Sequence, residues 1–297
     1  MVNIAIIGLG SMGRNHYRIL KGMDDVRIVA LCDVVKHDGF EEPFYTNVDK
    51  MFEEVKPDAV MIIVPTSLHK DIALKCVEYG VDMFIEKPVA SSVEDGKIMI
   101  EAIEKAGLKS CVGHVERFNP VVSALKDELK NQEIYSVAIT RVGPFPPRIA
   151  DVGVLTDLSV HDIDLVRFIT HRDILNKSIY KSRKIHNHHE DNAVLSFELN
   201  DEVIASITTN WLTPFKKRQI EVSCKDGYFE ADLILQTLNV YSEYHENNSY
   251  VVRSCYIKKD EPLVKELEAF VHYLKSGDRG DLATIEDSII TLKVASS

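Results

Sequence analysis

The sequence lacks three features: an excess of positive charge, a long apolar run and a regular spacing of cysteines. Its 297 residues include 35 Lys and Arg against 46 Asp and Glu, and the net charge of −11 argues against nucleic acid or an anionic membrane as a partner. No run reaches the roughly 18 apolar residues of a membrane-spanning helix, and the apolar run that begins at Asn3 leaves no room for a signal peptide. The cysteines are odd in number and scattered, which favours reduced thiols in a cytoplasmic protein: Cys32, Cys76, Cys111, Cys224 and Cys255.

A glycine-rich stretch stands at the start of the chain. Here an apolar run leads into the G-x-G-x-x-G spacing of a dinucleotide-binding turn. Gly8 permits a tight turn out of a buried strand, Gly10 lets the backbone approach a pyrophosphate, and Gly13 lets the next helix pack closely. Such a turn also occurs as plain architecture in α/β folds. We expect the phosphates to meet free N–H groups of this turn, formed by Gly8, Gly10, Ser11, Met12 and Gly13.

An acidic residue ends the next apolar run, Val26 to Cys32. Asp33 follows Gly13 by about 20 residues, the spacing of the ribose-binding acid in dinucleotide-binding folds. A carboxylate there accepts hydrogen bonds from the ribose hydroxyls and would repel a 2′-phosphate, so NAD is expected as the cofactor rather than NADP. The alternative is an ordinary turn residue, but strand, turn, helix and acid all agree with cofactor binding.

Apolar runs alternate with helix-like patterns up to about residue 115. This alternation is typical of right-handed βαβ units and predicts an α/β fold with a doubly wound parallel sheet. The expected strands are Asn3–Gly8, Val26–Cys32, Ala59–Val64, Asp82–Ile85 and Ser110–Gly113. The expected helices are Met12–Lys21, Asn47–Val55, Lys70–Tyr79 and Ser92–Ala106.

Polar residues follow the strand that ends at Val64. Pro65, Thr66 and His69 come at the carboxyl edge of the expected sheet, where doubly wound folds bind ligands. We therefore expect these residues to lie along the cofactor. For His69 alone, a helix-capping or surface histidine is the alternative.

The strand that ends at Ile85 leads into Glu86, Lys87 and Pro88. A lysine at a buried strand end beside a nicotinamide can hydrogen-bond a substrate hydroxyl and stabilise the alkoxide that develops as hydride leaves. Glu86 would hold the lysine in place, and the peptide before Pro88 is a candidate for the cis form. The alternative is a surface ion pair before a proline.

Taken together, these motifs resemble a known family. The glycine turn, Asp33, the segment from Pro65 to His69, and Glu86-Lys87-Pro88 have the order and spacing of the Gfo/Idh/MocA oxidoreductases, and the resemblance extends through nearly the whole chain. It implies a Rossmann domain followed by an α+β domain with a large, mostly antiparallel sheet. One face of that sheet commonly serves oligomerisation in the family, which implies a homodimer or homotetramer.

A second signature of the family, Asp-x-x-x-His on a helix, matches Asp157 and His161. Residues four apart share one face of an α-helix, so both side chains can point into one cleft. We assign His161 as general base because an imidazole titrates near neutral pH, and Asp157 as the group that orients substrate or imidazole. A lone histidine on an amphipathic helix is more often packed than catalytic, but the Lys87 motif favours catalysis.

The second half of the chain has longer segments of alternating apolar and polar residues, which predict an antiparallel sheet. We place the NAD-binding Rossmann domain at residues 1–118 and the substrate-binding and oligomerisation domain at residues 119–297. A helix is expected over Leu263–Lys275, and another begins at Ile285 without a cap before Ser297, so we expect the natural chain to continue. The expected strands are Ile134–Val142, Ala193–Leu199, Val203–Trp211, Arg218–Cys224, Gly227–Asp232, Thr237–Tyr241 and Tyr250–Tyr256.

Three stretches, at residues 114–120, 141–148 and 210–218, are similar to family members that oxidise the C3 hydroxyl of UDP-N-acetylglucosamine. An acidic protein that binds a nucleotide diphosphate needs a local cationic patch. Each cation has the alternative of a solvated or carboxylate-paired side chain. The candidates for substrate binding are Arg117, Arg148, Lys216 and Arg218.

Other functions stay open. An inositol or polyol dehydrogenase is the nearest alternative, and a glycosidase that uses NAD transiently is another. A sensor of NAD and sugar would not need Lys87, Asp157 and His161 together. No metal is expected, since the redox chemistry needs none, and residues 186–191, although rich in histidine, are expected to form a solvated loop.

Overall fold

The computed structural model describes residues 1–146, 152–242 and 249–296, and the chain divides into two compact units. Unit 1 comprises Met1–Val115 and Leu263–Ile290, and unit 2 comprises Glu116–Pro262 and the chain from Thr291 onward. The prediction of one continuous boundary after residue 118 is therefore corrected. Residues 263–290 return to unit 1 because they complete its core: Phe270 is fully buried, and its ring lies 5.5 Å from that of Phe84.

The sheet of unit 1 has the order β3-β2-β1-β4-β5-β6, and every neighbouring pair is parallel. The order reverses between β1 and β4, and ligands of doubly wound sheets bind at the carboxyl ends of the strands at such a point. This confirms the predicted fold class, although the two-residue β3 was not expected. The strands are β1 (Val2–Ile7), β2 (Val26–Cys32), β3 (Phe44–Tyr45), β4 (Ala59–Ile62), β5 (Asp82–Ile85) and β6 (Ser110–Val112).

The helices of unit 1 begin and end at residues with clear local reasons. The Ser92 hydroxyl accepts a hydrogen bond from the Asp95 N–H at the start of α4, and Gly107 ends that helix with φ of +66°. The helices are α1 (Ser11–Lys21), α2 (Val48–Val55), α3 (His69–Tyr79), α4 (Val93–Ala106), α7 (Pro262–Ser276) and the first part of α8 (Ile285–Ala295).

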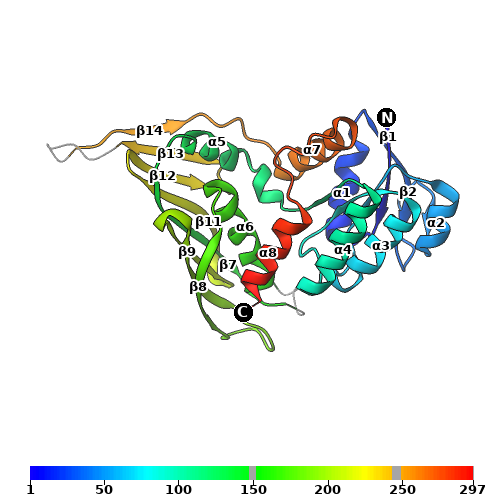
Figure 1. Cartoon of the computed structure of the whole chain (residues 1–297), viewed down its shortest axis with the longest axis horizontal. Helices are drawn as coiled ribbons and strands as arrows, with labels where there is room; N and C mark the ends of the chain where they lie inside the picture. Colours follow the sequence, from blue (N-terminus) through cyan, green and yellow to red (C-terminus); the bar gives the residue numbers. More distant parts are fainter. Residues whose placement is uncertain (147–151, 243–248, 297) are drawn as a thin grey trace. The chain divides into compact units, whose positions relative to one another are not determined.

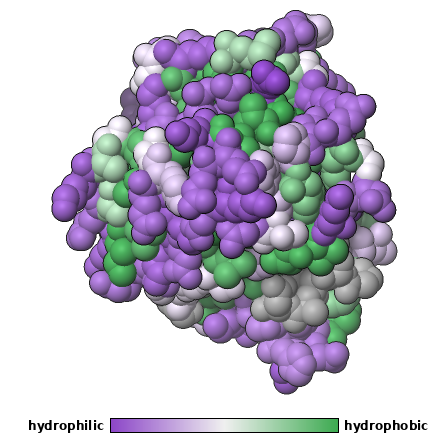
Figure 2. Space-filling view, turned by 90° about the vertical axis from the view of Figure 1, so that its right-hand side faces the viewer, coloured by the Kyte–Doolittle hydropathy of each residue, from purple (hydrophilic) through white to green (hydrophobic). Residues whose placement is uncertain are grey.

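The face of the molecule in Figure 2 is mostly hydrophilic, with apolar residues in scattered patches.

The sheet of unit 2 has the order β14-β13-β12-β11-β7-β10-β9-β8 (Figure 1). All pairs are antiparallel except β7 with β10, as the mostly antiparallel prediction expects. Edge strand β8 was not predicted because most of its residues are exposed on both faces, which hides the alternation. The strands are β7 (Ile134–Pro144), β8 (Ile174–Ser182), β9 (Asn192–Leu199), β10 (Ile204–Asn210), β11 (Leu212–Cys224), β12 (Gly227–Asp232), β13 (Thr237–Ser242) and β14 (Val252–Cys255).

Two helices, α5 (Pro120–Leu129) and α6 (Val160–Thr170), pack on one face of this sheet. Leu125 and Ile163 are fully buried there and belong to one apolar core with Ile139 and Ile207. The described residues also form short helical turns at Thr66–Leu68, Val115–Phe118, Leu155–Ser159 and Asn200–Glu202.

In the described part of the chain, no helix is long and apolar enough to cross a membrane. All five cysteines are free, and four of them are buried. Burial raises the pKa of the Cys76 thiol to about 12, so this side chain is an uncharged packing group at neutral pH.

Candidate active site

The three glycines of the first turn meet different surroundings. Gly8 has φ of +97°, and a Cβ atom there would lie 2.1 Å from the Ile63 carbonyl oxygen. A Cβ atom on Gly13 would lie 2.0 Å from the Gly8 carbonyl oxygen, so only glycine fits at either position. At Gly10, by contrast, no described atom lies within 4 Å of such a Cβ atom. The turn is therefore closed on its protein side and open at Gly10, as pyrophosphate binding requires.

Asp33 closes this turn from the end of β2. Its Oδ2 accepts a hydrogen bond of 2.6 Å from the Leu9 N–H, and its Oδ1 accepts one of 3.3 Å from the Val35 N–H. A carboxylate offers about four acceptor sites, so capacity for ribose hydroxyls remains. Two basic groups lie nearby, because His37 Nε2 is 3.5 Å from Asp33 Oδ2 and Arg14 Nη2 is 3.2 Å from His37 Nδ1. The glycine turn and the Asp33 carboxylate together fit the pyrophosphate and ribose of an NAD molecule.

His69 lies at the start of α3, directly after the turn that begins at Thr66. Its Nε2 is 2.9 Å from the carbonyl oxygen of Val64, and its Nδ1 is 3.0 Å from that of Pro88. Burial lowers the pKa of His69 and outweighs the opposite effect of these backbone carbonyls. The imidazole therefore braces the end of β4 against the segment after Lys87. Because both ring nitrogens lie against backbone carbonyls, His69 contributes to the position of the turn that holds Pro65 and Thr66, and its predicted contact with the cofactor stays a prediction.

Glu86 and Lys87 follow β5, and the peptide bond between Lys87 and Pro88 is cis. Glu86 is 8% exposed; its Oε1 lies 2.8 Å from His16 Nε2, and its Oε2 accepts a hydrogen bond from the Lys87 N–H at 3.2 Å. Burial raises the pKa of Glu86, but the hydrogen bond and charge of His16 more than offset it, so the pKa lies below its ordinary value. Glu86 thus fixes the backbone of Lys87.

His16 was not predicted from the sequence as a site residue. It lies on the buried face of α1 with Gly13 and Leu20 and is completely buried. The signal was present, since a histidine three residues after the last glycine of the turn shares its helical face. Nothing in the sequence, however, indicated that Glu86 would reach it across 70 positions.

In unit 2, Asp157 lies in a π-helical turn, Leu155–Ser159, and His161 in the first turn of α6. The prediction of an ordinary α-helix across both residues is corrected here. Glu190 anchors the start of the turn, because its carbonyl oxygen accepts from the Val154 N–H at 3.0 Å and its Oε1 from the Leu155 N–H at 3.2 Å. A Cβ atom on Gly153 would lie 2.2 Å from Glu190 Oε1, so a larger residue would displace this anchor. π-Helical turns occur frequently at functional sites.

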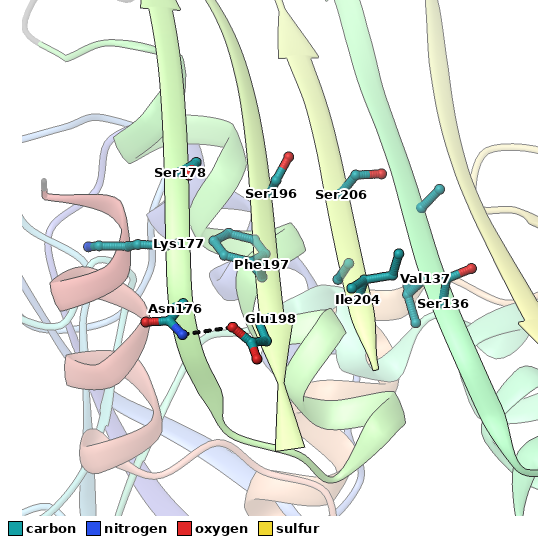
Figure 3. A pocket seen from close by; sticks show the side chains of 12 residues that line it. Ser136, Val137, Asn176, Lys177, Ser178, Ser196, Phe197, Glu198, Ile204 and Ser206 are labelled. Atoms are coloured by element: carbon teal, nitrogen blue, oxygen red, sulfur yellow. Dashed lines mark hydrogen bonds between the residues drawn. The ribbon is translucent and has the colours of Figure 1, made fainter. Parts of the chain in front are cut away.

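A cavity of about 140 Å³ brings several predicted residues of unit 2 together. Asp157 lines it with Lys216 and Arg218, as predicted, and Arg141 and Trp211 complete much of the wall. Arg148 lies outside the described residues. A larger hollow, about 520 Å³, lies on strands β8, β9, β10 and β7, and its lining mixes serines with apolar and charged side chains such as Ile204 and Glu198 (Figure 3). Of the predicted site residues that the structure describes, none lines that hollow, so we assign the candidate site to the smaller cavity.

An ion-pair network supports the cavity. Arg141 is 3% exposed and donates from Nε to Asp162 Oδ1 at 2.7 Å and from Nη1 to Glu116 Oε1 at 2.8 Å. Arg218 Nη1 donates to the same Glu116 oxygen at 3.1 Å. Burial raises the pKa of Asp162 to about 6, although Arg141 acts in the opposite direction. Arg218 was predicted from the sequence, but its partner Glu116 was not, because 102 positions of the chain separate the two residues.

Arg117 is placed differently from the prediction. It is 6% exposed, and it donates from Nε and Nη2 to the two carboxylate oxygens of Asp164 at 2.7 and 2.5 Å. Its guanidinium lies 4.8 Å from the centre of the Phe168 ring. Arg117 does not line the cavity of Asp157, so its expected contact with substrate phosphate is replaced by a structural ion pair.

The histidine-rich loop is ordered rather than simply solvated. His186 is 6% exposed, and its Nδ1 accepts hydrogen bonds from the N–H groups of His188 and His189. The Asp191 carboxylate accepts from the N–H groups of residues 184–186, which lowers the pKa of Asp191 against the opposing effect of burial. Within the ranges that the structure describes, no group of three His, Cys, Asp or Glu side chains is placed to hold a metal ion.

Comparisons with known proteins identify relatives for both halves of the chain. Residues 2–114 match the model of an oxidoreductase family with an NAD-binding Rossmann fold, GFO_IDH_MocA, and residues 133–230 match the C-terminal domain of the same family. The chain is 27% identical to the UDP-N-acetylglucosamine 3-dehydrogenase of Acidithiobacillus ferrooxidans, over 80% of this chain and 75% of that protein. It is 26% identical to the myo-inositol 2-dehydrogenase of Thermotoga maritima, over 93% of this chain and 89% of that protein.

A solved structure of the A. ferrooxidans enzyme has the same fold, with a TM-score of 0.89 at 22% identity over 99% of this chain and 95% of that one. Unit 1 is therefore an NAD-binding Rossmann domain.

Proposed function

The chain belongs to the Gfo/Idh/MocA family of NAD-dependent oxidoreductases, and from that premise we propose that it oxidises the C3 hydroxyl of UDP-N-acetylglucosamine to a 3-keto sugar nucleotide. The observation that carries this choice is the cavity of unit 2, in which Asp157 shares a wall with Lys216 and Arg218. A carboxylate of the family signature and two cations in one cavity suit a sugar that carries a phosphate.

Bound NAD would supply the hydride acceptor. The Lys87 ammonium would donate a hydrogen bond to the reacting hydroxyl and stabilise the negative charge that develops on its oxygen. Glu86 contributes indirectly, because its hydrogen bonds to His16 and to the Lys87 N–H hold the backbone from which the ammonium extends.

In unit 2, His161 would accept the hydroxyl proton as general base. Asp157 would orient the substrate or the imidazole from the π-helical turn, which Glu190 anchors to the neighbouring loop. The ion pairs of Glu116 with Arg141 and Arg218 would keep the cavity wall in one arrangement.

A second candidate is a myo-inositol or polyol dehydrogenase. It is favoured by the T. maritima relative, whose match covers more of this chain than that of the UDP-sugar enzyme. A neutral cyclic polyol would need Asp157 but would offer Lys216 and Arg218 no anionic group of a substrate to bind.

A substrate screen tests the proposal. UDP-N-acetylglucosamine, UDP-glucose, N-acetylglucosamine and myo-inositol are each incubated with NAD, and NADH is followed by absorbance. Turnover highest on UDP-N-acetylglucosamine is expected, with a 3-keto product identified by mass spectrometry. Turnover on myo-inositol alone would replace the proposal with the second candidate.

We also propose a cytoplasmic homodimer or homotetramer that assembles through the sheet face opposite α5 and α6. That face presents small polar side chains, among them Ser178, Ser196 and Ser206 (Figure 3). Sedimentation equilibrium of the protein and of Ser196→Arg tests this, since a bulky charge at a packed interface would shift the mass toward the monomer.

A further inference from the structure

We propose that the cavity lined by Asp157, Lys216 and Arg218 binds an anionic group held within one pyranose ring of the reacting carbon, a sugar carboxylate or the first phosphate. The substrate class is then an acidic or phosphorylated sugar, and the rest of a nucleotide adds little to recognition in this cavity. The inference rests on the proposed function and narrows it to a particular part of the substrate.

The size of the cavity sets the first limit. At about 140 Å³ it is smaller than the 300–1,000 Å³ that pockets for larger ligands typically offer. It therefore accommodates a single ring or a charged substituent, but not a complete nucleotide sugar. Whatever anion meets Lys216 and Arg218 must lie close to the part of the sugar that meets Asp157.

The balance of charge sets the second limit. Of the three cations in the wall, Arg141 faces both Asp162 and Glu116. Arg218 shares a single oxygen of Glu116, and its side chain remains 38% exposed. No ion pair involving Lys216 occurs among the described residues. Asp157 is the one acidic side chain in the described cavity wall, so the wall keeps an excess of positive charge.

The electrostatics of Arg218 point the same way. Burial lowers the pKa of Arg218, and the neighbouring Arg141 guanidinium lowers it further. A guanidinium nevertheless stays protonated, so its burial and the repulsion from Arg141 destabilise the folded protein. Binding of an anion would relieve this unfavourable electrostatic energy. Guanidinium groups bind carboxylates and phosphates through two parallel hydrogen bonds, and the bond to Glu116 occupies only Nη1.

The strand geometry explains why only two of the three consecutive cations of β11 line the described cavity wall. Lys216 and Arg218 are two positions apart on β11 and both line the wall. Alternate residues of a strand point to the same side, and Lys217 between them does not line the cavity. Lys217 therefore provides a matched control of equal charge on the same strand.

Pairs of substrates that differ only in charge test the proposal. The holoenzyme is assayed with N-acetylglucosamine 1-phosphate against N-acetylglucosamine, and with glucuronate against glucose. We expect kcat/KM of the wild type to favour at least one charged partner by 10-fold or more, and the pair that shows it identifies phosphate or carboxylate as the source. Arg218→Gln and Lys216→Gln should each reduce this ratio about 10-fold. Lys217→Gln should leave it as in the wild type.

Calorimetry separates failure of this inference from failure of the proposed function. Binding of N-acetylglucosamine 1-phosphate and of glucuronate to the NAD-loaded protein is measured without turnover, so the result holds even if C3 of UDP-N-acetylglucosamine is not the reacting centre. Binding that weakens in Lys216→Gln, an exposed residue whose loss leaves the ion-pair network intact, supports the anionic subsite. Equal ratios in wild type and both variants, or equal binding of charged and neutral sugars, would overturn it.

Discussion

The two units support their candidate sites through different kinds of contact. In unit 1, carboxylates accept hydrogen bonds from backbone groups: Asp33 accepts from the Leu9 N–H, and Glu86 accepts from the Lys87 N–H. In unit 2, the cavity wall is supported by ion pairs between side chains: Arg141 binds Asp162 and Glu116, and Arg218 binds the same glutamate.

The two buried carboxylates beside the catalytic candidates differ in the direction of their pKa shifts. Glu86 precedes Lys87 and has a partner on each oxygen, and its pKa lies below the ordinary value despite burial. Asp162 follows His161 and uses only Oδ1 in the hydrogen bonds of the described residues, and burial raises its pKa to about 6. Both carboxylates are buried, but their charged neighbours differ: His16 and Lys87 lower the pKa of Glu86, whereas the Glu116 carboxylate adds to the effect of burial on Asp162 and opposes Arg141.

The largest expected effect separates chemistry from stability in unit 1. Lys87→Met should lower kcat by about 10³-fold, because a preorganised donor to the developing alkoxide is lost. The midpoint of urea unfolding should change little, since the hydrogen bond from the residue 87 N–H to Glu86 does not depend on the side chain. Lys97→Met on the exposed face of α4 is the control. Turnover of Lys87→Met equal to that of the control would refute the catalytic assignment.

The next effect should appear in unit 2 as lost stability. Arg117→Leu removes the guanidinium that binds both oxygens of the buried Asp164 carboxylate, and breaking such a pair costs about 3–5 kcal/mol. The exposed pair of Arg253 with Glu128 is the comparison, where Arg253→Leu should cost at most about 1 kcal/mol. Both values come from urea titrations followed by circular dichroism. Equal losses would mean that burial does not distinguish the two pairs.

A smaller effect concerns cofactor choice. Asp33→Ala should reduce the preference for NAD over NADP, by about 10-fold, because the repulsion of a 2′-phosphate is removed while Arg14 and His37 remain within reach of it. Asp33→Asn keeps an acceptor for the Leu9 N–H and tests charge separately from turn structure. The ratio of kcat/KM for the two cofactors is the measurement, and an unaltered ratio in both variants would remove Asp33 from cofactor selection.

The smallest effect is on pH dependence. In the wild type, the lowered pKa of Glu86 means that its stabilising contribution is present above about pH 4.5 and is lost as the pH falls. In His16→Ala, burial would dominate and raise that pKa, so stability would instead fall as the pH rises. The variant should therefore lose about 1–3 kcal/mol at pH 7 and less at pH 4. His272→Ala, exposed on α7, should show the same loss at both pH values.

The cofactor end of unit 1 was largely predictable because its determinants are local. Gly8, Gly13 and Asp33 belong to one βαβ unit, and their constraints are visible as spacing. The partner of Glu86 was not predictable, since His16 meets it only through the fold.

The cavity of unit 2 shows the limit of sequence patterns more clearly. Lys216, Arg218 and Arg117 were indistinguishable as basic residues, yet the first two line the cavity and the third is buried against Asp164. The fold decides this, because Arg117 lies in the turn Val115–Phe118 and meets Asp164 of α6, whereas Lys216 and Arg218 lie on β11, where alternate residues share a face. The π-helical turn around Asp157 was equally hidden, because it depends on contacts of Glu190 with residues far away in the chain.

The return of residues 263–290 to unit 1 has a consequence for how the protein is made. A ribosome releases the whole Rossmann sheet long before it synthesises Phe270, Ala283 and Ile289. Until then, Phe84 lacks the Phe270 ring against which it packs. The Val112 N–H lacks its acceptor, the carbonyl oxygen of Ala283, and the surface at Gly96 is not yet covered by Ile289. A nascent chain that ends near residue 118 should therefore be sensitive to protease and dependent on chaperones, and NAD binding should arise late in synthesis, when the last helices arrive.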